Sequence, residues 1–415
     1  MKKMVGRKQH DIKNANHRLI LEQLRHKERL SRIELARNLS LSAPSISKNV
    51  DELIRKNVLL ETGTVITSAG RRPCMVEINR NYGCVAVVDF SSEDTRIALA
   101  NMRAELIDFC TVPGGAWLND AHLQKVKERL RQMLDKQNSP RPLLNISIGT
   151  PGDIDRKTGD FLYAPRFQNC SVRNLQHFFN DTFHVDVFVK NDVNLATMGE
   201  NLFGAGIGCS NMLYVSVDYG IGSGVILNGK LYEGSRGFFG EIGLWIVDIK
   251  RTLEEYEKSG IPTEDVLDSR VSCFAIQRNV SHMLQNGQQS ILHNWVNKAE
   301  DVTIDKIIKA YRLRDPLCVE VVKKAALQLA CALKNIIDFL DIDMVILGGL
   351  SHKFGDNYLD VIRDFLNKTQ PTGSPKLVWA RLGHESTLYG AIGDALEYAF
   401  DQIVIQNMDE EAVKR

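Results

Sequence analysis

Apolar residues recur at helical spacing in three short stretches near the amino terminus, which predicts three consecutive helices. The first covers residues 17–26, the second begins at Ser31 and runs to residue 39, and the third begins at Ser42. Ser31 and Glu34 have the spacing of a capping box, which satisfies backbone N–H groups at the start of a helix. The side chains predicted to be buried are Leu19, Ile20, Leu21, Leu24, Ile33, Leu35, Ala36, Ile46, Val50, Leu53 and Ile54. Three short helices in this order indicate a helix-turn-helix.

Two β-prone stretches, at residues 58–61 and 74–78, follow the third helix and flank a polar turn that carries Arg71 and Arg72. A hairpin in this position is a wing. Arginines at the tip of a wing can contact DNA phosphates or enter a minor groove. The alternative is an ordinary solvated hairpin tip.

The third helix has a polar side opposite its apolar one, and this side carries Ser42, Ser45, Lys48 and Asn49. Serine and asparagine can meet base edges, and lysine can reach phosphate. A well-capped, solvated helix end is the alternative. Charge favours DNA, because residues 1–80 hold 17 Lys or Arg against 8 Asp or Glu, a net charge of +9, while the rest of the chain carries −8. The expected partner is a double-stranded DNA operator.

Composition sets the wider frame. A chain of 415 residues with 44% hydrophobic content predicts a globular protein of two or three domains. The eight cysteines are scattered singly, which indicates reduced, mostly packed thiols. Neither a secretory signal nor a run of eighteen apolar residues is present, so we expect a cytoplasmic protein with no membrane partner.

The remaining chain contains a repeated strand–turn–strand pattern. The first copy begins near Tyr82, and the second follows about 129 residues later, which places Asp89 opposite Asp218. Two related α/β lobes with a ligand cleft between them are expected. The second copy has alternating glycines, Gly220, Gly222 and Gly224, that either bring backbone N–H groups to a phosphate or let two strands reverse tightly.

Further candidate residues follow strands of these lobes. Gly348 and Gly349 end a buried strand where a nucleotide could lie, or where a helix start packs on the sheet. Asn191 and Asp192 end a short strand before a helix; they could bind sugar hydroxyls, with Asp192 accepting a proton, or simply cap the helix. Glu241 is a similar candidate and is expected to precede a strand.

Taken in order, these motifs resemble the ROK proteins (repressors, open reading frames and kinases), in particular their xylose-repressor-like and N-acetylglucosamine-repressor-like branch. The likeness runs from about Asn16 to Phe400. The motifs that carry it are "SRIELARNLSLSAPSISKNVDELI", "SAGRRP", "GTPGDIDRKTG", "VKNDVNLATMGENLFGAG", "YGIGSGVILNGKLYEG", "GEIG", "VILGGLS" and "STLYGAIGDA". The resemblance implies an amino-terminal winged helix-turn-helix fused to duplicated α/β lobes of the actin and hexokinase (ribonuclease H-like) type.

The resemblance also implies roles for single residues. In family kinases the residue matching Asp192 is the catalytic base, those matching Asn191 and Glu241 hold the sugar, and the one matching Asp89 lies by the metal and phosphates. After Asp89, however, residues 90–94 supply no glycine and add two carboxylates, each costing on the order of 1 kcal/mol or more beside a phosphate. Phosphoryl transfer depends on positioning and charge, so the resemblance predicts lost kinase activity and no ATP–Mg²⁺ cofactor.

Two other family features are altered. Leu244 stands at the position of a zinc-binding histidine and Val266 at that of a zinc-binding cysteine, so no metal is expected. Asp268 falls where the family has a sugar-binding glutamate. The sugar site is therefore expected at Asn191, Asp192, Glu241 and Asp268, with a vestigial nucleotide site at Asp89, Gly220, Gly222, Gly224, Gly348 and Gly349.

The expected domains are a winged helix-turn-helix over residues 1–80, a first lobe over 81–195 joined by a carboxyl-terminal helix at 388–405, and a dimerising second lobe over 196–387. The favoured function is a sugar-responsive transcriptional regulator, in particular a repressor, that binds a sugar or sugar phosphate and forms a homodimer or tetramer. Two alternatives stay open: an active ATP-dependent sugar kinase, and a regulator that obeys a protein partner.

Overall fold

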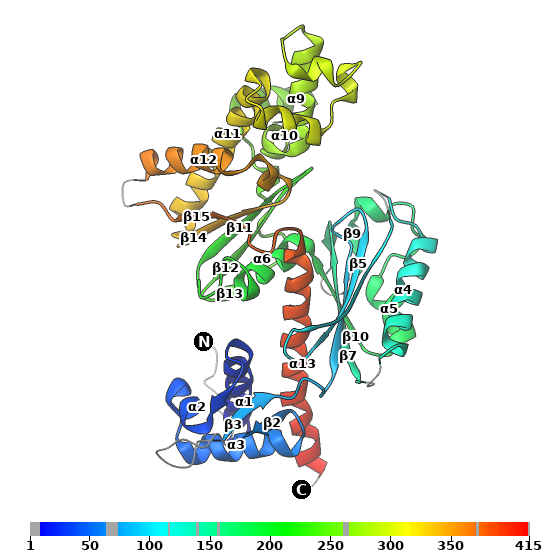
Figure 1. Ribbon diagram of the computed structural model, residues 1–415, viewed down its shortest axis with the longest axis vertical. Coiled ribbons are helices and arrows are strands. Elements are labelled where there is room, and N and C mark those ends of the chain that lie inside the picture. Colours follow the sequence, from blue (N-terminus) through cyan, green and yellow to red (C-terminus); the bar gives the residue numbers. More distant parts are fainter. Residues whose placement is uncertain are drawn as a thin grey trace. The chain divides into compact units, whose positions relative to one another are not determined.

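The computed structural model describes residues 9–63, 74–114, 117–137, 141–155, 158–259, 265–370 and 373–413. The chain folds as two compact units (Figure 1). One unit takes Met1–Thr150, Thr158–Val189 and Ile392–Arg415; the other takes Pro151–Lys157 and Lys190–Ala391. The amino-terminal helices and the first lobe thus fall in one unit, and most of the second unit is the continuous stretch Lys190–Ala391.

The amino-terminal region, called the head below, contains the three predicted helices and a small sheet. Its elements are α1 Gln9–His26, β1 Leu30–Ser31, α2 Arg32–Leu39, α3 Ala43–Arg55, β2 Leu59–Thr62 and β3 Met75–Ile78. The sheet has the antiparallel order β1-β3-β2, so β2 and β3 form the predicted hairpin. The Ser31–Glu34 capping box is present at the start of α2. Arg71 and Arg72 lie outside the described residues.

Helical geometry corrects part of the predicted core of the head. Ile20, Leu21 and Leu35 are buried, whereas Ile33 is 64% exposed and Leu19 is also exposed. Successive residues of a helix are turned by about 100°, so Ile33 points to the side of α2 opposite Leu35. For the same reason Leu19 cannot share one face with both Ile20 and Leu21.

The first lobe is built on a five-stranded sheet. Its strands are β4 Cys84–Asp89, β5 Thr95–Asn101, β6 Leu106–Val112, β7 Leu143–Thr150 and β10 Asp186–Asn191. Their order is β10-β7-β4-β5-β6, with β4, β5 and β6 antiparallel in sequence and β7 parallel to β4. Helices α4 Asp120–Asp135 and α5 Leu175–Phe183 supply buried side chains to the same core, and β8 Asp153–Ile154 pairs with β9 Phe161–Tyr163.

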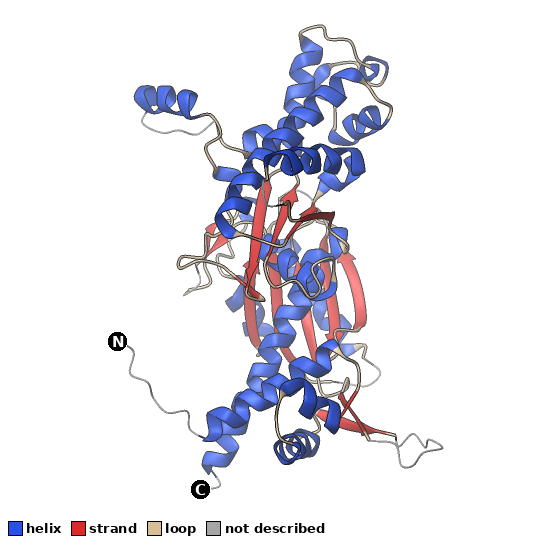
Figure 2. Ribbon diagram, turned by 90° about the vertical axis from the view of Figure 1, so that its left-hand side faces the viewer, coloured by secondary structure: helices blue, strands red, loops and turns tan. Residues whose placement is uncertain are grey.

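The second lobe repeats this plan. Its strands are β11 Met212–Val217, β12 Ile221–Leu227, β13 Lys230–Leu231, β14 Met344–Gly348 and β15 Lys376–Trp379. The order β13-β12-β11-β14-β15 again has an antiparallel hairpin beside a parallel strand. β4 and β11 therefore hold the same place in the two sheets, which confirms the predicted duplicated α/β fold. Figure 2 shows helices packed against the strands of both sheets.

Helices surround the second sheet and connect it to the rest of the chain. They are α6 Asp192–Phe203, α7 Ile249–Ser259, α8 Asp268–Val271, α9 Cys273–Gln285, α10 Ile304–Arg312, α11 Pro316–Leu340, α12 Asp356–Thr369 and α13 Ser386–Val413. The last helix, drawn in red in Figure 1, begins in the second unit and continues into the first. None of the helices among the described residues has a stretch long and apolar enough to span a bilayer.

Candidate functional site

The exposed side of α3 is the candidate DNA-binding face. Ser42 caps the helix by accepting a hydrogen bond from Ser45 N at 3.3 Å, and Lys48 is exposed one turn further on. Asn49 does not belong to this face, which corrects the sequence-based assignment. It is 6% exposed, and its Nδ2 donates to the Ser45 carbonyl at 2.7 Å. An asparagine that bonds to the preceding turn of its own helix is occupied with local structure.

Arg32 is a residue that the sequence analysis missed. Its Nη2 donates to Asp51 at 2.6 Å and to Glu61 at 2.7 Å, so it joins α3 to strand β2 of the wing. This bridge fixes the wing against the helix that would enter a groove. The partners lie 19 and 29 residues away in the chain, so no local pattern could reveal them.

Asn191 and Asp192 lie at the junction of β10 and α6. Asn191 is the cap of α6: its Oδ1 accepts from Val193 N at 2.9 Å and Asn194 N at 3.2 Å. The capping alternative is therefore the arrangement found, and Asn191 Nδ2 donates to the Gly152 carbonyl at 3.4 Å. Asp192 opens the helix, where a carboxylate is stabilised by the positive end of the helix dipole.

Asp153 brings a further carboxylate to this junction. It follows Gly152 in chain order, and its charge contributes to raising the pKa of Glu241. Burial is the larger cause for Glu241, and burial also raises the pKa of Asp153 itself. Asp153 belongs to the "GTPGDIDRKTG" motif, one of the motifs that carry the family resemblance. The sequence analysis gave this residue no role of its own.

Glu241 precedes a short 3₁₀ helix, Ile242–Leu244, and not the expected strand. The turn before it is tight: Gly240 has φ +98°, and its carbonyl accepts from Ser223 Oγ at 2.7 Å. A Cβ at Gly240 would lie 2.2 Å from the Ser223 carbonyl oxygen, so only glycine fits. This contact with β12 fixes where the Glu241 backbone begins.

Asp268 starts α8 and faces the turn between β11 and β12. Its Oδ1 accepts from Ile221 N at 2.7 Å, and burial raises its pKa. Asp153, Glu241 and Asp268 are all half-buried carboxylates whose pKa is raised. Such groups are incompletely solvated hydrogen-bond acceptors, and hydroxyl donors of a ligand would complete their hydrogen bonding.

The glycines assigned to a vestigial phosphate turn have a packing role in the structure. Gly222 and Gly224 belong to β12, against α6; a Cβ there would lie 2.7 Å from Val193 Cγ2 and 2.1 Å from Thr197 Oγ1, respectively. At Gly220 the nearest contact would be an ordinary 3.4 Å. Close approach of the helix that carries Asp192 therefore accounts for two of the three glycines.

Gly348 and Gly349 are also closely packed, in this case against residues of β11. A Cβ at Gly348 would lie 2.2 Å from the Tyr214 hydroxyl oxygen. Gly349 has φ +76° and precedes the 3₁₀ helix Leu350–Phe354, and its Cβ would lie 2.6 Å from the Val217 carbonyl oxygen. Tight packing at the end of β14 explains both residues without a nucleotide.

Asp89 is neutralised within the first lobe. It is fully buried at the end of β4 and pairs with Arg96 Nη2 of β5 at 2.5 Å. The turn that follows is held by Arg166, which donates to the carbonyls of Phe90, Ser92 and Glu93. One guanidinium group therefore pairs with the Asp89 carboxylate, and a second binds the backbone carbonyls of the turn that follows it.

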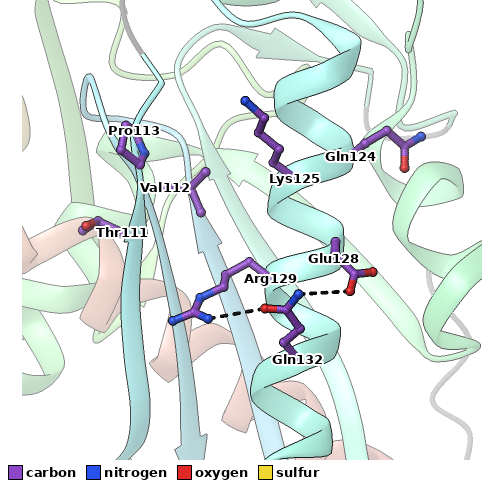
Figure 3. Close-up of a pocket in the computed structure, with 8 residues that line it drawn as sticks. All are labelled: Thr111, Val112, Pro113, Gln124, Lys125, Glu128, Arg129 and Gln132. Atoms are coloured by element: carbon purple, nitrogen blue, oxygen red, sulfur yellow. Dashed lines mark hydrogen bonds between the residues drawn. The ribbon is translucent and has the colours of Figure 1, made fainter.

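A surface hollow of about 500 Å³ lies between β6 and α4 in the first lobe (Figure 3). Its lining residues are Thr111, Val112, Pro113, Gln124, Lys125, Glu128, Arg129 and Gln132. It contains none of the candidate sugar residues. We assign the ligand site from the carboxylates of the second unit, because this open hollow has no buried polar group to orient a ligand. Among the described residues, no three His, Cys, Asp or Glu side chains gather as a metal site requires.

Comparison with known proteins matches both parts of the chain. The ROK family model matches residues 116–396, and a winged helix-turn-helix DNA-binding model matches residues 13–59. The chain is 25% identical to the xylose repressor of Caldicellulosiruptor bescii over 366 residues, covering 86% of this chain and 88% of that protein. It is 26% identical to the transcriptional dual regulator NagC of Escherichia coli over 389 residues, covering 92% of each.

Solved structures share the fold. A ROK family transcriptional regulator, described as a homologue of the Escherichia coli MLC protein, superposes with a TM-score of 0.79 at 22% identity, over 96% of this chain and 98% of that one. A ROK family glucokinase from Streptomyces griseus superposes with a TM-score of 0.60 at 21% identity, over 75% of this chain and 99% of that one. The family model spans most of the chain, and the protein therefore belongs to the ROK family, with a winged helix-turn-helix at its amino terminus.

Proposed function

We propose that this protein is a transcriptional repressor that binds a double-stranded DNA operator through its head and responds to a sugar or sugar phosphate. The observation that carries the proposal is the combination, in one chain, of a winged helix-turn-helix with a ROK body in which Arg96 pairs with Asp89 and Arg166 binds the carbonyls of the turn that follows. Of the relatives described above, one is a xylose repressor by name and the other, NagC, is a DNA-binding transcriptional dual regulator by name, which supports the same reading. Its DNA partner implies a cytoplasmic protein, and paired heads on a pseudo-palindrome imply a homodimer or a tetramer.

The sugar would be held by carboxylates of the second unit. Asp192, Glu241 and Asp268, joined by Asp153, accept hydrogen bonds from hydroxyl groups, while Asn191 holds the start of α6 in place. Burial raises the pKa of Asp153, Glu241 and Asp268, so ionisation of these carboxyl groups carries a desolvation penalty. Hydroxyl donors relieve that penalty, so ligand binding stabilises the site.

Kinase chemistry is disfavoured by charge and by space. Asp89 is already paired with Arg96, and the carbonyls of the following turn are bound by Arg166. Gly222 and Gly224 pack so closely against α6 that a side chain at either position would clash with it. The alternative, an active ATP-dependent sugar kinase, predicts sugar-dependent ATP consumption that Asp192→Asn abolishes.

A route from the sugar site to the head runs along α13. Thr387 Oγ1 donates to the Asp192 carbonyl at 3.3 Å, and Ser386 Oγ donates to buried Glu200 of α6 at 2.8 Å. Glu200 also accepts from the backbone N of Arg381 at 3.0 Å and Leu382 at 2.8 Å. A shift of α6 on sugar binding is thereby imposed on the start of α13.

Fluorescence anisotropy tests the proposal directly. Labelled DNA from upstream of the protein's own gene is titrated with protein at fixed salt, with and without a panel of sugars and sugar phosphates. Nanomolar-range binding that one compound changes by about fivefold or more supports the proposal. Binding of only nonspecific strength to every fragment, unchanged by every compound, contradicts it. Sugar-dependent ATP hydrolysis in a parallel assay would favour the kinase alternative.

A further inference from the structure

The turn between β5 and β6 is buried, although the tip of a hairpin is usually solvated. It covers residues 102–105 of the first lobe. Met102 is fully buried, and the side chain of Arg103 is only 10% exposed. An arginine that has lost most of its hydration requires carboxylate partners nearby. The turn is therefore covered by another part of its unit, and the partners of Arg103 identify that part.

Arg103 forms ion pairs with two elements of the head. Its Nη2 lies 3.6 Å from Oε2 of Glu28, in the loop between α1 and β1. Its Nη1 lies 3.8 Å from Oε2 of Glu77, on β3. Its Nε lies 3.8 Å from Oε1 of Glu105, within the turn itself. One planar guanidinium with several donors thus connects the head to the first lobe.

Asn101, at the end of β5, gives this turn a defined shape. Its Oδ1 accepts from Arg103 N at 2.8 Å and from Glu105 N at 3.2 Å. Its Nδ2 donates to Oε2 of Glu105 at 2.8 Å. Ala104 has φ +61°, a left-handed conformation that is uncommon for alanine and that these hydrogen bonds hold in place. The first lobe therefore determines where the backbone of Arg103 lies.

The short connection from β3 to β4 is also held by hydrogen bonds. Asn79 Nδ2 donates to the Asn57 carbonyl of the head at 2.7 Å. Two residues further along, Asn81 Oδ1 accepts from Arg141 Nη2 of the first lobe at 2.7 Å. The connection is thus bound to the head at one end and to the lobe at the other, unlike a flexible linker.

We propose that Arg103 is a positioning residue for DNA binding, which holds the head on the first lobe at one orientation. The inference rests on the proposed function, because the orientation of a head matters when two heads read paired half-sites. Each base pair added between two half-sites moves one of them by about 3.4 Å and rotates it by about 35°. Heads of fixed orientation therefore favour one spacing, whereas loosely held heads accept several.

Loss of Arg103 should leave the head itself folded. Glu77 is 8% exposed, and its Oε2 also accepts from Arg29 Nε, within the head, at 2.8 Å. This buried carboxylate therefore keeps one guanidinium partner when Arg103 is removed, so no uncompensated charge is left in the fold. Variants at Arg103 can consequently change how the head is held without unfolding it.

Time-resolved fluorescence anisotropy of the full chain, without DNA or sugar, tests whether the head is held. A dye is attached through a noncanonical amino acid in place of Arg37, an exposed residue of α2. In wild type the dye should report mainly the slow rotation of the whole particle. Arg103→Glu should increase the amplitude of the fast decay about twofold or more, because like charges then face Glu28 and Glu77. Arg131→Glu is the matched control, since Arg131 pairs with Glu128 within α4, and it should behave as wild type.

Rescue variants assign the effect to the ion pairs. Combining Arg103→Glu with Glu28→Arg restores opposite charges between the turn and the head, and should remove about half or more of the added fast amplitude. Arg103→Lys keeps the positive charge and should resemble wild type. Circular dichroism shows whether each variant is folded. Arg103→Ala introduces no new charge and provides the same measurement if Arg103→Glu misfolds.

The spacing between half-sites provides the functional measurement. Two base pairs are inserted between the half-sites of the operator that the DNA titrations identify. The insertion should weaken binding of wild type by about tenfold or more and that of Arg103→Glu by about threefold or less. Binding to a single half-site should be the same for both proteins. A merely structural defect would instead lower the affinity for every DNA alike.

Two outcomes would overturn the inference. One is a fast decay of the same amplitude in wild type and in folded Arg103→Glu and Arg103→Ala. The other is a spacing dependence that these variants leave unchanged. If wild type binds no DNA fragment specifically, the proposed function fails, while the anisotropy decay still decides whether Arg103 holds the head. The two failures are therefore distinguishable.

Discussion

Arg18 of α1 lies 2.8 Å from Glu397 of α13, and the same guanidinium also pairs with Asp401 one turn further along. The first helix of the DNA-binding head is thereby joined to the helix whose other end contacts Asp192 and Glu200. All three side chains are partly exposed, so the pairs contribute little to global stability. Their effect should appear in communication between ligand and DNA.

Removing Arg18 should uncouple the two ends of α13. We expect Arg18→Ala to keep the melting temperature of wild type while shrinking the sugar-induced change in DNA affinity by about threefold or more, within the usual range of coupling energies. Anisotropy titrations with and without sugar measure this change. Arg29→Ala is the control, because Arg29 pairs with Glu77 inside the head and should leave the coupling intact. Recovery in Arg18→Glu combined with Glu397→Arg would assign the effect to this pair.

Lys48 and Asn49 should behave differently although they are neighbours. Lys48→Ala removes a phosphate contact, so affinity should fall alike for all DNA sequences and the log–log salt slope should drop by about 1. Asn49→Ala should instead lower the free energy of unfolding by about 1 kcal/mol, because it removes a buried hydrogen bond to Ser45, and it should leave sequence preference unchanged. Anisotropy at several salt concentrations and urea melts separate the two. A change of base preference in Asn49→Ala would return that residue to the DNA face.

Glu241 should make stability depend on pH in an unusual direction. Burial, and then the charge of Asp153, raises its pKa in the folded protein. The folded state therefore keeps the proton to higher pH than the unfolded chain, whose glutamate titrates near pH ~4.3, so the stabilising contribution is full below that pH and is lost as pH rises through the folded pKa. Glu241→Gln should raise the melting temperature of the sugar-free protein at neutral pH and weaken sugar binding.

Thermal melts from acid to neutral pH provide the measurement for Glu241. The gain in Glu241→Gln should shrink as pH falls, because wild type becomes protonated there too. Glu320→Gln, at an exposed position of α11, is the matched control and should follow wild type throughout. A neutral-pH melting temperature below that of wild type would show that the Glu241 charge stabilises the fold.

Gly224 and Gly220 distinguish packing from phosphate binding. Gly224→Ala would place a Cβ 2.1 Å from Thr197 Oγ1, so α6 must move, and we expect a loss of about 1–3 kcal/mol in stability together with weaker sugar binding. Gly220→Ala meets only a 3.4 Å contact and should be tolerated. Chemical denaturation and sugar titration provide both readings. Equal tolerance at the two positions would contradict the packing role.

Local chemistry was sufficient for much of the fold. Three features of the head depend on residues within a few positions of one another and could be predicted from the sequence. They are the Ser31–Glu34 capping box, the start of α3 at Ser42 and the hairpin that follows α3. The duplicated strand pattern likewise predicted two related α/β lobes, and the two sheets of the structure have corresponding strand orders. The same local rules misplaced Ile33 and Leu19, because a list of apolar residues ignores the direction in which each leaves the helix.

The sequence by itself determined the head, the two α/β lobes and the family, since motif order and hydrophobic periodicity are properties of the chain. Only the tertiary structure decided which polar groups are occupied. Arg96 pairs with Asp89 because the two residues lie opposite each other in the β4–β5 register. Glu200 accepts a hydrogen bond from Ser386, which lies 186 residues away in the chain. The partner of a buried charge depends on which elements pack together in the fold. A carboxylate in a low-dielectric interior is stabilised by the hydrogen-bond donor that lies next to it after packing, and the spacing of residues along the chain does not encode which donor that is.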